Sequence, residues 1–287
     1  MATLPPLREV IDRHGLLAKR SLGQNFLLDL NLTGRIARAG GMYTGINVIE
    51  VGPGPGGLTR GLLETDAASI HAIERDDRCV AALQELVEAA GGRIILHADD
   101  ALKIDYGVIC PPPRAIVANL PYNIATTLLV GWLKQLTLFQ SLTLMFQREV
   151  ADRLAAETRT KDYGRLSVLV QWLAHVEKKF DIPPEAFTPP PKVTSSVVHI
   201  VPKPRTDTVR IDTMERLTAA AFGQRRKMLR QSLKSLGSSY PGFTPEPFLE
   251  KAGVSATARA EEIDIDGFVR MAKILQAEYP PLQRRKS

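Results

Sequence analysis

Cysteine is scarce in this sequence, and long apolar runs are missing from it. The two cysteines, Cys79 and Cys110, stand 31 positions apart and form no C-x-x-C pair. Neither a disulfide framework nor a zinc site is therefore indicated, and we predict no bound metal. No apolar run approaches the roughly 18 residues that a membrane-spanning helix needs; even residues 125–133 are interrupted by two threonines and a glycine. These absences predict a soluble protein of a reducing, cytoplasmic compartment, with no membrane partner.

Composition is otherwise that of a globular protein, but charge is unevenly placed. Hydrophobic residues make up 44% and charged residues 24% of 287 residues, enough for a sizeable core and about two domains. From Arg205 onward fifteen Lys and Arg stand against ten Asp and Glu, whereas the first 204 residues hold 22 against 21. A near-neutral body joined to a basic region is typical of a catalytic domain with an appendage that binds a polyanion, although solubility alone would also produce it.

Strand-like and helix-like segments alternate through the first two thirds of the chain. The first 40 residues are expected to form a leader and a helix. The expected strands are 47–51, 69–74, 93–98, 115–118 and 141–146, and the expected helices are 57–64, 76–90, 124–136 and 148–157. This alternation indicates βαβ units and a mainly parallel, doubly wound sheet. Two later β segments, 178–187 and 193–201, flank a proline-rich loop and predict a hairpin at the edge of the sheet.

A change of pattern near residue 204 predicts a domain boundary. Residues 1–204 are expected to form the sheet domain, and residues 205–287 a small basic helical domain. Apolar residues at helical spacing predict one helix over 211–236 and another over 268–277. Cations at i, i+4 and i+8 then form one stripe, with two more beside it: Arg226, Arg230 and Lys234, with Arg225 and Lys227. Such a stripe favours contacts with RNA phosphates. The alternative interpretation is an ordinary helix face exposed to solvent.

A glycine-rich turn follows the first expected strand. Gly52 and Gly54 belong to the run Gly-Pro-Gly-Pro-Gly-Gly, where backbone can approach a ligand closely and a helix then begins. Glu74 ends the next strand, 22 positions after Gly52, where an acid is placed to accept bonds from ribose hydroxyls. Asp99 and Asp100 end the third strand, and either one could bond an adenine amino group. These features indicate an adenosine-bearing cofactor, and NAD and S-adenosylmethionine both satisfy them.

The fourth strand ends in the tetrapeptide Asn119-Leu120-Pro121-Tyr122. Carboxyl ends of parallel strands line the ligand crevice of a doubly wound sheet, so this tetrapeptide is expected beside the reactive end of the cofactor. Asn119 offers a neutral amide oxygen, Leu120 precedes a proline and is therefore extended, and Tyr122 offers a ring for stacking. These residue types suit chemistry at an amino group on a planar base. A strand-terminating turn with a half-buried tyrosine is the alternative.

Several segments together resemble the ribosomal RNA adenine N6,N6-dimethyltransferase family, from about Lys19 to about Ala277. The resemblance is carried by Gln24-Asn25-Phe26-Leu27, Glu50-Val51-Gly52-Pro53-Gly54, Asn119-Leu120-Pro121-Tyr122, Phe146-Gln147-Arg148-Glu149-Val150, Tyr163-Gly164-Arg165-Leu166-Ser167 and Phe187-Thr188-Pro189-Pro190-Pro191-Lys192-Val193. It implies a Rossmann-like methyltransferase sheet, S-adenosylmethionine as cofactor, and dimethylation of two adjacent adenosines near the 3′ end of small-subunit rRNA. It also implies a role in small-subunit maturation, with the precursor particle as partner of a monomeric enzyme.

The resemblance assigns roles by motif. The residues implied to bind the cofactor are Asn25, Leu27, Gly52, Gly54, Glu74, Asp100 and Asn119. The residues implied to act on the base are Asn119, Leu120, Pro121 and Tyr122, with Phe187 as the second ring of a sandwich around it. Asp100 is preferred to Asp99 because the family's acid immediately precedes the small residue that is Ala101 here.

Two other functions compete with this prediction. An NAD-dependent oxidoreductase would use the same glycine turn, but the five histidines match no catalytic motif, and His71 and His97 lie within strands and are expected in the core. An RNA- or ribosome-binding assembly factor, or a transcription-factor paralogue, would keep the fold without the reaction. An intact Asn119–Tyr122 motif argues against a purely binding role.

Overall fold

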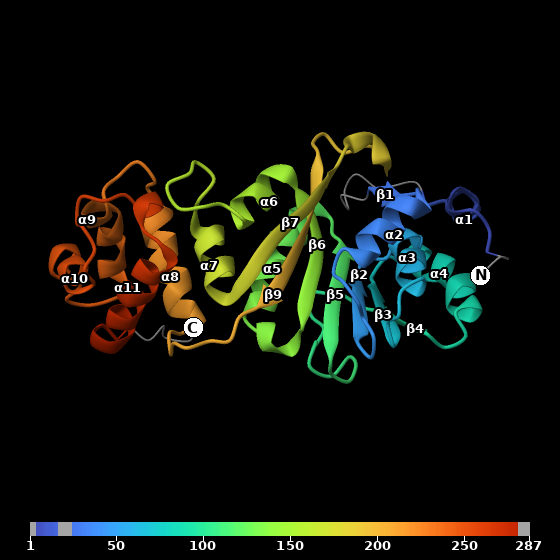
Figure 1. Cartoon of the computed structure of the whole chain (residues 1–287), viewed down its shortest axis with the longest axis horizontal. Helices are drawn as coiled ribbons and strands as arrows, with labels where there is room; N and C mark the ends of the chain where they lie inside the picture. The colour runs from blue at the N-terminus through green and yellow to red at the C-terminus, as the bar shows by residue number, and fades with distance from the viewer. Residues whose placement is uncertain (1–3, 17–24, 281–287) are drawn as a thin grey trace. The chain divides into compact units, whose positions relative to one another are not determined.

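The computed structural model describes residues 4–16 and 25–280, which form two compact units (Figure 1). The first unit comprises Met1–Ala151 and Val176–Pro202, and the second comprises Asp152–His175 and Lys203–Ser287. The second unit thus takes in residues 152–175 besides the basic region that the sequence marks off, because helix α7 (Arg165–Leu173) packs against α8 (Ile211–Phe222) and α11 (Ile265–Glu278). Within the described ranges, no helix has the length and apolar character that crossing a membrane requires.

A seven-stranded sheet forms the centre of the first unit, in the order β4-β3-β2-β5-β6-β9-β7. Its strands are β2 (Asn47–Val51), β3 (Ser69–Glu74), β4 (Ile94–Ala98), β5 (Arg114–Asn119), β6 (Ser141–Gln147), β7 (Ala174–Ile182) and β9 (Ser195–Pro202). β4, β3, β2, β5 and β6 run parallel, and β9 lies antiparallel to β6. The predicted doubly wound, mainly parallel sheet and the edge hairpin of β7 and β9 are confirmed.

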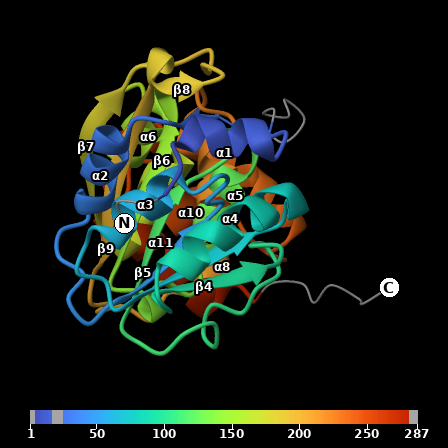
Figure 2. The ribbon, with the colours of Figure 1, turned by 90° about the vertical axis from the view of Figure 1, so that its right-hand side faces the viewer.

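Helices cover both faces of this sheet, as Figures 1 and 2 show for α2 and α5. The helices of the first unit are α1 (Leu7–Arg13), α2 (Leu30–Arg38), α3 (Gly57–Leu63), α4 (Asp77–Ala89), α5 (Tyr122–Leu133) and the start of α6 (Arg148–Leu154). Asp29 caps α2 by accepting a hydrogen bond from the backbone N–H of Asn31 at 2.8 Å. The first helix, α1, was not predicted.

A two-stranded ladder pairs segments far apart in the sequence. β1 (Phe26–Leu27) runs antiparallel to β8 (Phe187–Thr188), with Leu27 opposite Phe187. Strands of two residues carry no periodicity, so the sequence could not reveal this pairing. It holds Phe26 and Leu27, which precede α2, against the segment that follows β7.

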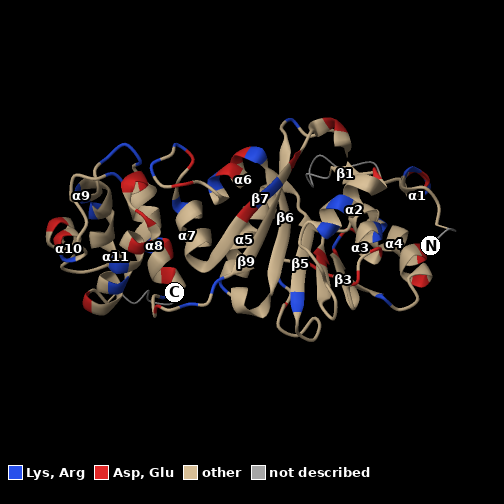
Figure 3. Ribbon diagram, viewed as in Figure 1, with Lys and Arg blue, Asp and Glu red and all other residues tan. Residues whose placement is uncertain are grey.

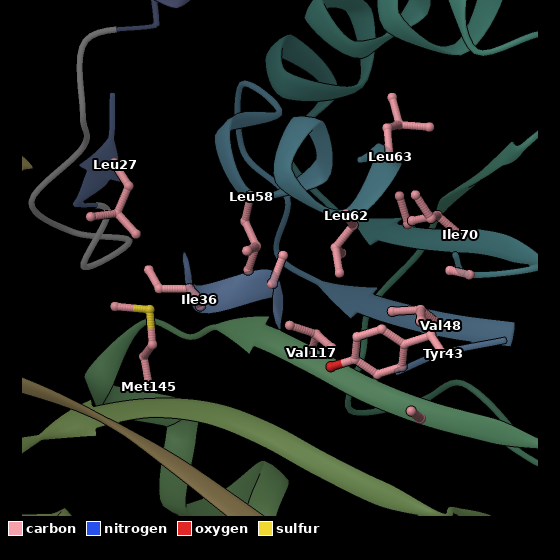
Figure 4. Close-up of a cluster of buried hydrophobic side chains, with 14 of the residues drawn as sticks. Leu27, Ile36, Tyr43, Val48, Leu58, Leu62, Leu63, Ile70, Val117 and Met145 are labelled. Carbon is pink, nitrogen blue, oxygen red and sulfur yellow. The ribbon is translucent and has the colours of Figure 1, made fainter. Parts of the chain in front are cut away.

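Apolar side chains from α2, α3 and the sheet form one core cluster (Figure 4). Ile36 of α2, Leu62 of α3 and Val48 of β2 are among its members and are at most 1% exposed. Burying a side chain of this size contributes about 1.5–3 kcal/mol each, which fixes α3 and hence the turn before it.

Replacement of glycine by alanine is expected to change stability in opposite directions at two helical positions. A Cβ at Gly61 of α3 would lie 2.7 Å from the carbonyl oxygen of Thr33 in α2, whereas a Cβ at Gly131 in α5 would meet nothing within 4 Å. We expect Gly61→Ala to lower the free energy of unfolding by about 1–3 kcal/mol through forced separation of the helices. Gly131→Ala should raise it by about 0.5–1 kcal/mol, since alanine is the better helix former. Urea unfolding monitored by circular dichroism measures both, and equal shifts would contradict the steric argument.

The second unit is helical but does not contain the long helix expected over 211–236. Its helices after α8 are α9 (Leu229–Ser232), a 3-10 helix at Leu233–Ser238, α10 (Pro245–Lys251) and α11. The helix ends at Phe222 because the following backbone pairs with another segment. Met228 forms a β-bridge with Arg259, and the N–H of Leu229 donates to the carbonyl of Ala258 at 2.8 Å. The prediction of one helical stripe bearing Arg226, Arg230 and Lys234 is therefore wrong.

Candidate active site

A pocket of about 170 Å³ opens at the carboxyl ends of β2, β3 and β5. Ten residues singled out from the sequence line it together: Asn25, Leu27, Gly52, Gly54, Glu74, Asp100, Asn119, Leu120, Pro121 and Tyr122. Parallel strands deliver their carboxyl ends to one edge, which explains how positions spread over 98 residues converge. Gln24, quoted in the first motif, lies outside the described residues.

The glycine-rich turn forms one wall of this pocket. Gly52 and Gly54 have φ of +71° and +55°, the left-handed region in which a side chain is strained. Just beyond them, a Cβ on Gly57 would lie 2.4 Å from the carbonyl oxygen of Leu27. Glycine is therefore needed both to turn the chain and to let the β1 segment lie against the start of α3.

Glu74 connects this turn to the end of β3. Its Oε2 accepts a hydrogen bond from the N–H of Gly54 at 3.1 Å, and its Oε1 accepts from the N–H groups of Arg75 and Asp76 at 2.8 and 2.9 Å. Burial raises the pKa of Glu74, and the three N–H donors act against that rise. Three of the carboxylate's roughly four acceptor sites are thus used, and the remaining site on Oε2 suits a ribose hydroxyl, so this carboxylate fits an adenosine cofactor.

Two neighbouring acids follow β4, which ends at Ala98. Asp99 and Asp100 both line the pocket. Asp100 accepts a hydrogen bond from the N–H of Leu102 at 3.0 Å, and its other oxygen lies 3.5 Å from the guanidinium of Arg75. Asp99 accepts from the N–H of Asp100 at 2.6 Å. The preference for Asp100 as the adenine contact stays a prediction.

Asn119, at the end of β5, has a defined amide orientation. Its Nδ2 donates a hydrogen bond to the carbonyl oxygen of Asn25 at 3.3 Å. A carbonyl can only accept, so the amide nitrogen must face Asn25 and Oδ1 must face away. Because Asn119 lines the pocket, this oxygen is the acceptor offered to a ligand there. Asn25 thus contributes to the site by fixing Asn119.

The two aromatic residues assigned to the base have different surroundings. Tyr122 lines the pocket, and its hydroxyl is hydrogen-bonded to that of Ser195; burial raises the pKa of Tyr122. Phe187 is 2% exposed, belongs to the core cluster and is not among the pocket-lining residues of the described chain. Its expected place in a sandwich around the base is not observed, because pairing of β8 with β1 turns its ring into the core.

A buried acid that the sequence analysis did not single out lies behind the turn. Glu50 of β2 is 1% exposed, and within the described residues neither carboxylate oxygen has a hydrogen-bond partner. Burial raises the pKa of Glu50 to about 8, so the neutral form dominates at pH 7. The signal was present in the sequence, as an acid inside an apolar strand two positions before Gly52.

Potential metal ligands do not cluster in the described part of the chain. No group of three or more His, Cys, Asp or Glu residues is arranged to hold an ion there. His71 is 7% exposed and stacks on His97, with Nδ1 of the first 3.1 Å from Nε2 of the second. The pair lies in β3 and β4, and burial lowers the pKa of both rings.

The predicted RNA-binding cations fall on loops and short helical turns of the second unit. Arg225 bonds Oε2 of Glu261 at 2.7 Å and the carbonyl of Thr160 at 3.2 Å, so it ties the loop at 223–228 to two other loops. Arg226, Lys227 and Lys234 are exposed, and Arg230 is half-buried. Figure 3 shows the blue of Lys and Arg along the loop between α8 and α9.

A buried carboxylate beside a glycine turn, next to an oriented amide at the end of β5, is the arrangement of a Rossmann-like methyltransferase. Residues 15–277 match the family described as ribosomal RNA adenine dimethylase, and the chain belongs to this family. S-adenosylmethionine is its methyl donor, and the predicted rRNA adenine dimethyltransferase activity is confirmed.

Relatives and solved structures agree with this assignment. The chain is 57% identical to proteins named ribosomal RNA small subunit methyltransferase A from Paramagnetospirillum magneticum (96% of this chain, 97% of the relative) and Rhodospirillum rubrum (96% and 93%). The fold is similar to that of a dimethyladenosine transferase from Plasmodium falciparum, with TM-score 0.75, 25% identity and coverage of 88% and 97%. It is also similar to that of the 23S rRNA methyltransferase ErmE, with TM-score 0.64, 28% identity and coverage of 88% and 100%.

Proposed function

We propose that this chain transfers methyl groups from S-adenosylmethionine to N6 of two adjacent adenosines near the 3′ end of small-subunit rRNA. The observation that carries the proposal is the orientation of Asn119, whose amide oxygen is offered to the pocket because its amide nitrogen bonds Asn25. The 57% identical relatives named ribosomal RNA small subunit methyltransferase A favour the small subunit as the source of the RNA.

The chemistry of the tetrapeptide follows from the electronic structure of adenine. The N6 lone pair is delocalised into the ring, so the free amine is a poor nucleophile. Oδ1 of Asn119 and the carbonyl of Leu120 accept the two N6 hydrogens and thereby favour a pyramidal nitrogen with a directed lone pair. S-adenosylmethionine, when bound, supplies an electrophilic methyl group. Holding the reactants near attack geometry can lower the barrier by about 7–11 kcal/mol. No general base is needed beforehand, because the ammonium formed on N6 is acidic and would lose its proton to solvent after the transfer.

A target base must leave its stack before N6 can reach this site. Tyr122 is the ring that we assign to receive it, since it follows the catalytic residues and lines the pocket. Stacking of one base on one ring is worth about 1–3 kcal/mol. A stacking role for Phe187 would require its ring to leave the core cluster. We therefore assign stacking on the base to Tyr122.

One assay separates the candidate functions. The protein is incubated with methyl-labelled S-adenosylmethionine and small-subunit particles that lack the modification, and the rRNA is digested to nucleosides. We expect label in N6,N6-dimethyladenosine at two adjacent positions. Particle binding without transfer of label would instead favour an assembly factor, and would overturn the proposed reaction.

RNA binding is proposed to use a loop surface of the second unit in place of the expected helical stripe. The N–H of Arg159 donates to the carbonyl of Glu261 at 2.8 Å, and Arg225 joins the same loops. Exposed cations therefore gather on the three linked loops: Arg159, Lys161, Arg226, Lys227 and Arg259. Such a group fits the phosphates of an RNA strand.

The salt dependence of RNA binding tests this surface. For Arg226→Ala/Lys227→Ala we expect the slope of log K against log salt to flatten by about 0.7 per lost contact to single-stranded RNA. Titration of a fluorescent rRNA fragment at several salt concentrations gives the slope. Lys273→Ala on α11, also exposed, serves as the control for the loss of a surface cation, and the slopes are compared per charge removed. Equal slopes in the double variant and the wild type would make this surface ordinary solvated protein.

The biological setting remains part of the proposal. We infer a precursor of the small subunit as the partner, because in a finished particle fewer rRNA ends are open to a base-extruding enzyme. We propose a monomer that acts in the cytoplasm, where ribosomal substrates are found.

A further inference from the structure

Ser195 is the residue that holds the far end of the Tyr122 ring. Tyr122 is the first residue of α5, and its hydroxyl is hydrogen-bonded to the hydroxyl of Ser195, the first residue of β9. Ser195 is completely buried, and it stands 73 positions away in the sequence. The ring is therefore fixed at both ends, by its backbone in the helix and by its hydroxyl on a strand.

The start of β9 is a rigid support for this bond. Ser195 lies opposite Gln147 in the ladder with β6, and the N–H of Arg148 donates to the carbonyl of Thr194 at 2.9 Å. The next residue, Ser196, is also fully buried and donates its hydroxyl to Oδ1 of Asp181 at 2.6 Å. These backbone bonds restrict where the hydroxyl of Ser195 can lie, whereas the side chain of Ser196 belongs to the opposite face of the strand.

The bond to Ser195 has a counterpart at the other end of the tetrapeptide. Asn119 is held by the carbonyl of Asn25, and Tyr122 is held by Ser195. Leu120 and Pro121 lie between these two fixed points. The acceptor oxygens and the ring are therefore kept in one arrangement before the base arrives, which is what positioned catalysis requires.

We propose that Ser195 is a positioning residue for methyl transfer, which holds the Tyr122 ring in the orientation that stacks on the extruded adenine. The proposal rests on the assigned role of Tyr122. Without the bond, the ring regains rotation about its side-chain torsions and its hydroxyl loses a buried partner, so the base is received in a wider range of poses. The loss falls on transfer to RNA and leaves the cofactor contacts unchanged.

A double-mutant cycle on Ser195→Ala and Tyr122→Phe tests the proposal. Each variant removes one side of the same bond, and Tyr122→Phe keeps the ring. We expect each to lower kcat/KM for unmodified small-subunit particles by about tenfold, with Kd for S-adenosylmethionine changed by less than about twofold. The double variant should lose no more than either single variant, because the interaction is already absent. Losses that multiply in the double variant would overturn the proposal.

Ser196→Ala is the matched control, since it removes a buried hydroxyl from the adjacent position of the same strand. It should retain wild-type transfer; a loss equal to that of Ser195→Ala would assign the effect to a loosened β9 and overturn the positioning role. If Ser195→Ala does not fold, full transfer by Tyr122→Phe alone refutes the proposal. Tyr122→Ala distinguishes failure of the proposed stacking role of Tyr122 from failure of the positioning role of Ser195. Full transfer by Tyr122→Ala refutes the stacking role. Loss of transfer in Tyr122→Ala together with wild-type transfer in Ser195→Ala refutes the role of Ser195 alone.

Discussion

Replacing Asn119 by alanine is expected to lower kcat for methyl transfer by about 10²–10³-fold, with Kd for the RNA unchanged and Kd for S-adenosylmethionine within a few-fold. Removing one preorganised polar group that stabilises the transition state typically costs this much. Here the lost group is the acceptor oxygen that the bond to Asn25 directs away from β1. Single-turnover assays with saturating enzyme measure the chemical step separately from binding.

Two further substitutions show whether the acceptor oxygen is responsible. Asn119→Asp keeps acceptor oxygens but loses the N–H that bonds the carbonyl of Asn25, so we expect activity between those of Asn119→Ala and the wild type. Asn123→Ala removes an amide that lines the same pocket and has no assigned contact, and it should leave kcat within about twofold. Undiminished turnover in Asn119→Ala would remove the core of the mechanism.

The cofactor side of the site was predictable because its residues follow directly from strand ends. Gly52 comes after β2, Glu74 ends β3 and Asn119 ends β5. Parallel strands place their carboxyl ends side by side, so three local patterns in the sequence are sufficient to predict one shared pocket.

The contacts that complete the site were not predictable, because they join distant segments through single side chains. Asn25 and Asn119 are 94 positions apart, and Tyr122 and Ser195 are 73 apart. No periodicity or spacing reports such pairs. Phe187 shows the related difficulty: a ring before three prolines suited a stacking role, but the available apolar core competes for it, and it is 2% exposed.

The helix expected over 211–236 fails for a different physical reason. Leu229, Leu233 and Leu236 continue the apolar spacing of α8, and all three are buried as that spacing implies. They are buried on a chain that has turned, because Met228 and Leu229 pair with residues 258–259. The apolar periodicity therefore predicted correctly which residues are buried, but it predicted one continuous helix where the chain turns. The cations between these leucines consequently do not form the expected stripe.

Replacing Glu74 by alanine is expected to raise Kd for S-adenosylmethionine by about 10²-fold. A hydrogen bond to a charged group contributes about 1.5–3 kcal/mol, and the upper end of that range corresponds to about 10²-fold in Kd. The same substitution also frees the N–H of Gly54, which the carboxylate holds at 3.1 Å, and so loosens the glycine turn. Glu74→Gln keeps the shape and one acceptor oxygen, so we expect a loss of about tenfold. Isothermal titration calorimetry measures these affinities directly.

Ligand-induced stabilisation gives an independent measure of the same affinity. At a cofactor concentration 100 times the wild-type Kd, binding stabilises the wild type by about 2.7 kcal/mol, and a variant with 100-fold weaker affinity by only about 0.4 kcal/mol. Glu64→Ala, at an exposed position after α3, should behave as the wild type. If Glu74→Ala folds and is stabilised as strongly as the wild type, the carboxylate serves the turn alone. The ribose must then find its acceptors elsewhere, and Asp76 and Asp99, which line the same pocket, would be the residues to test.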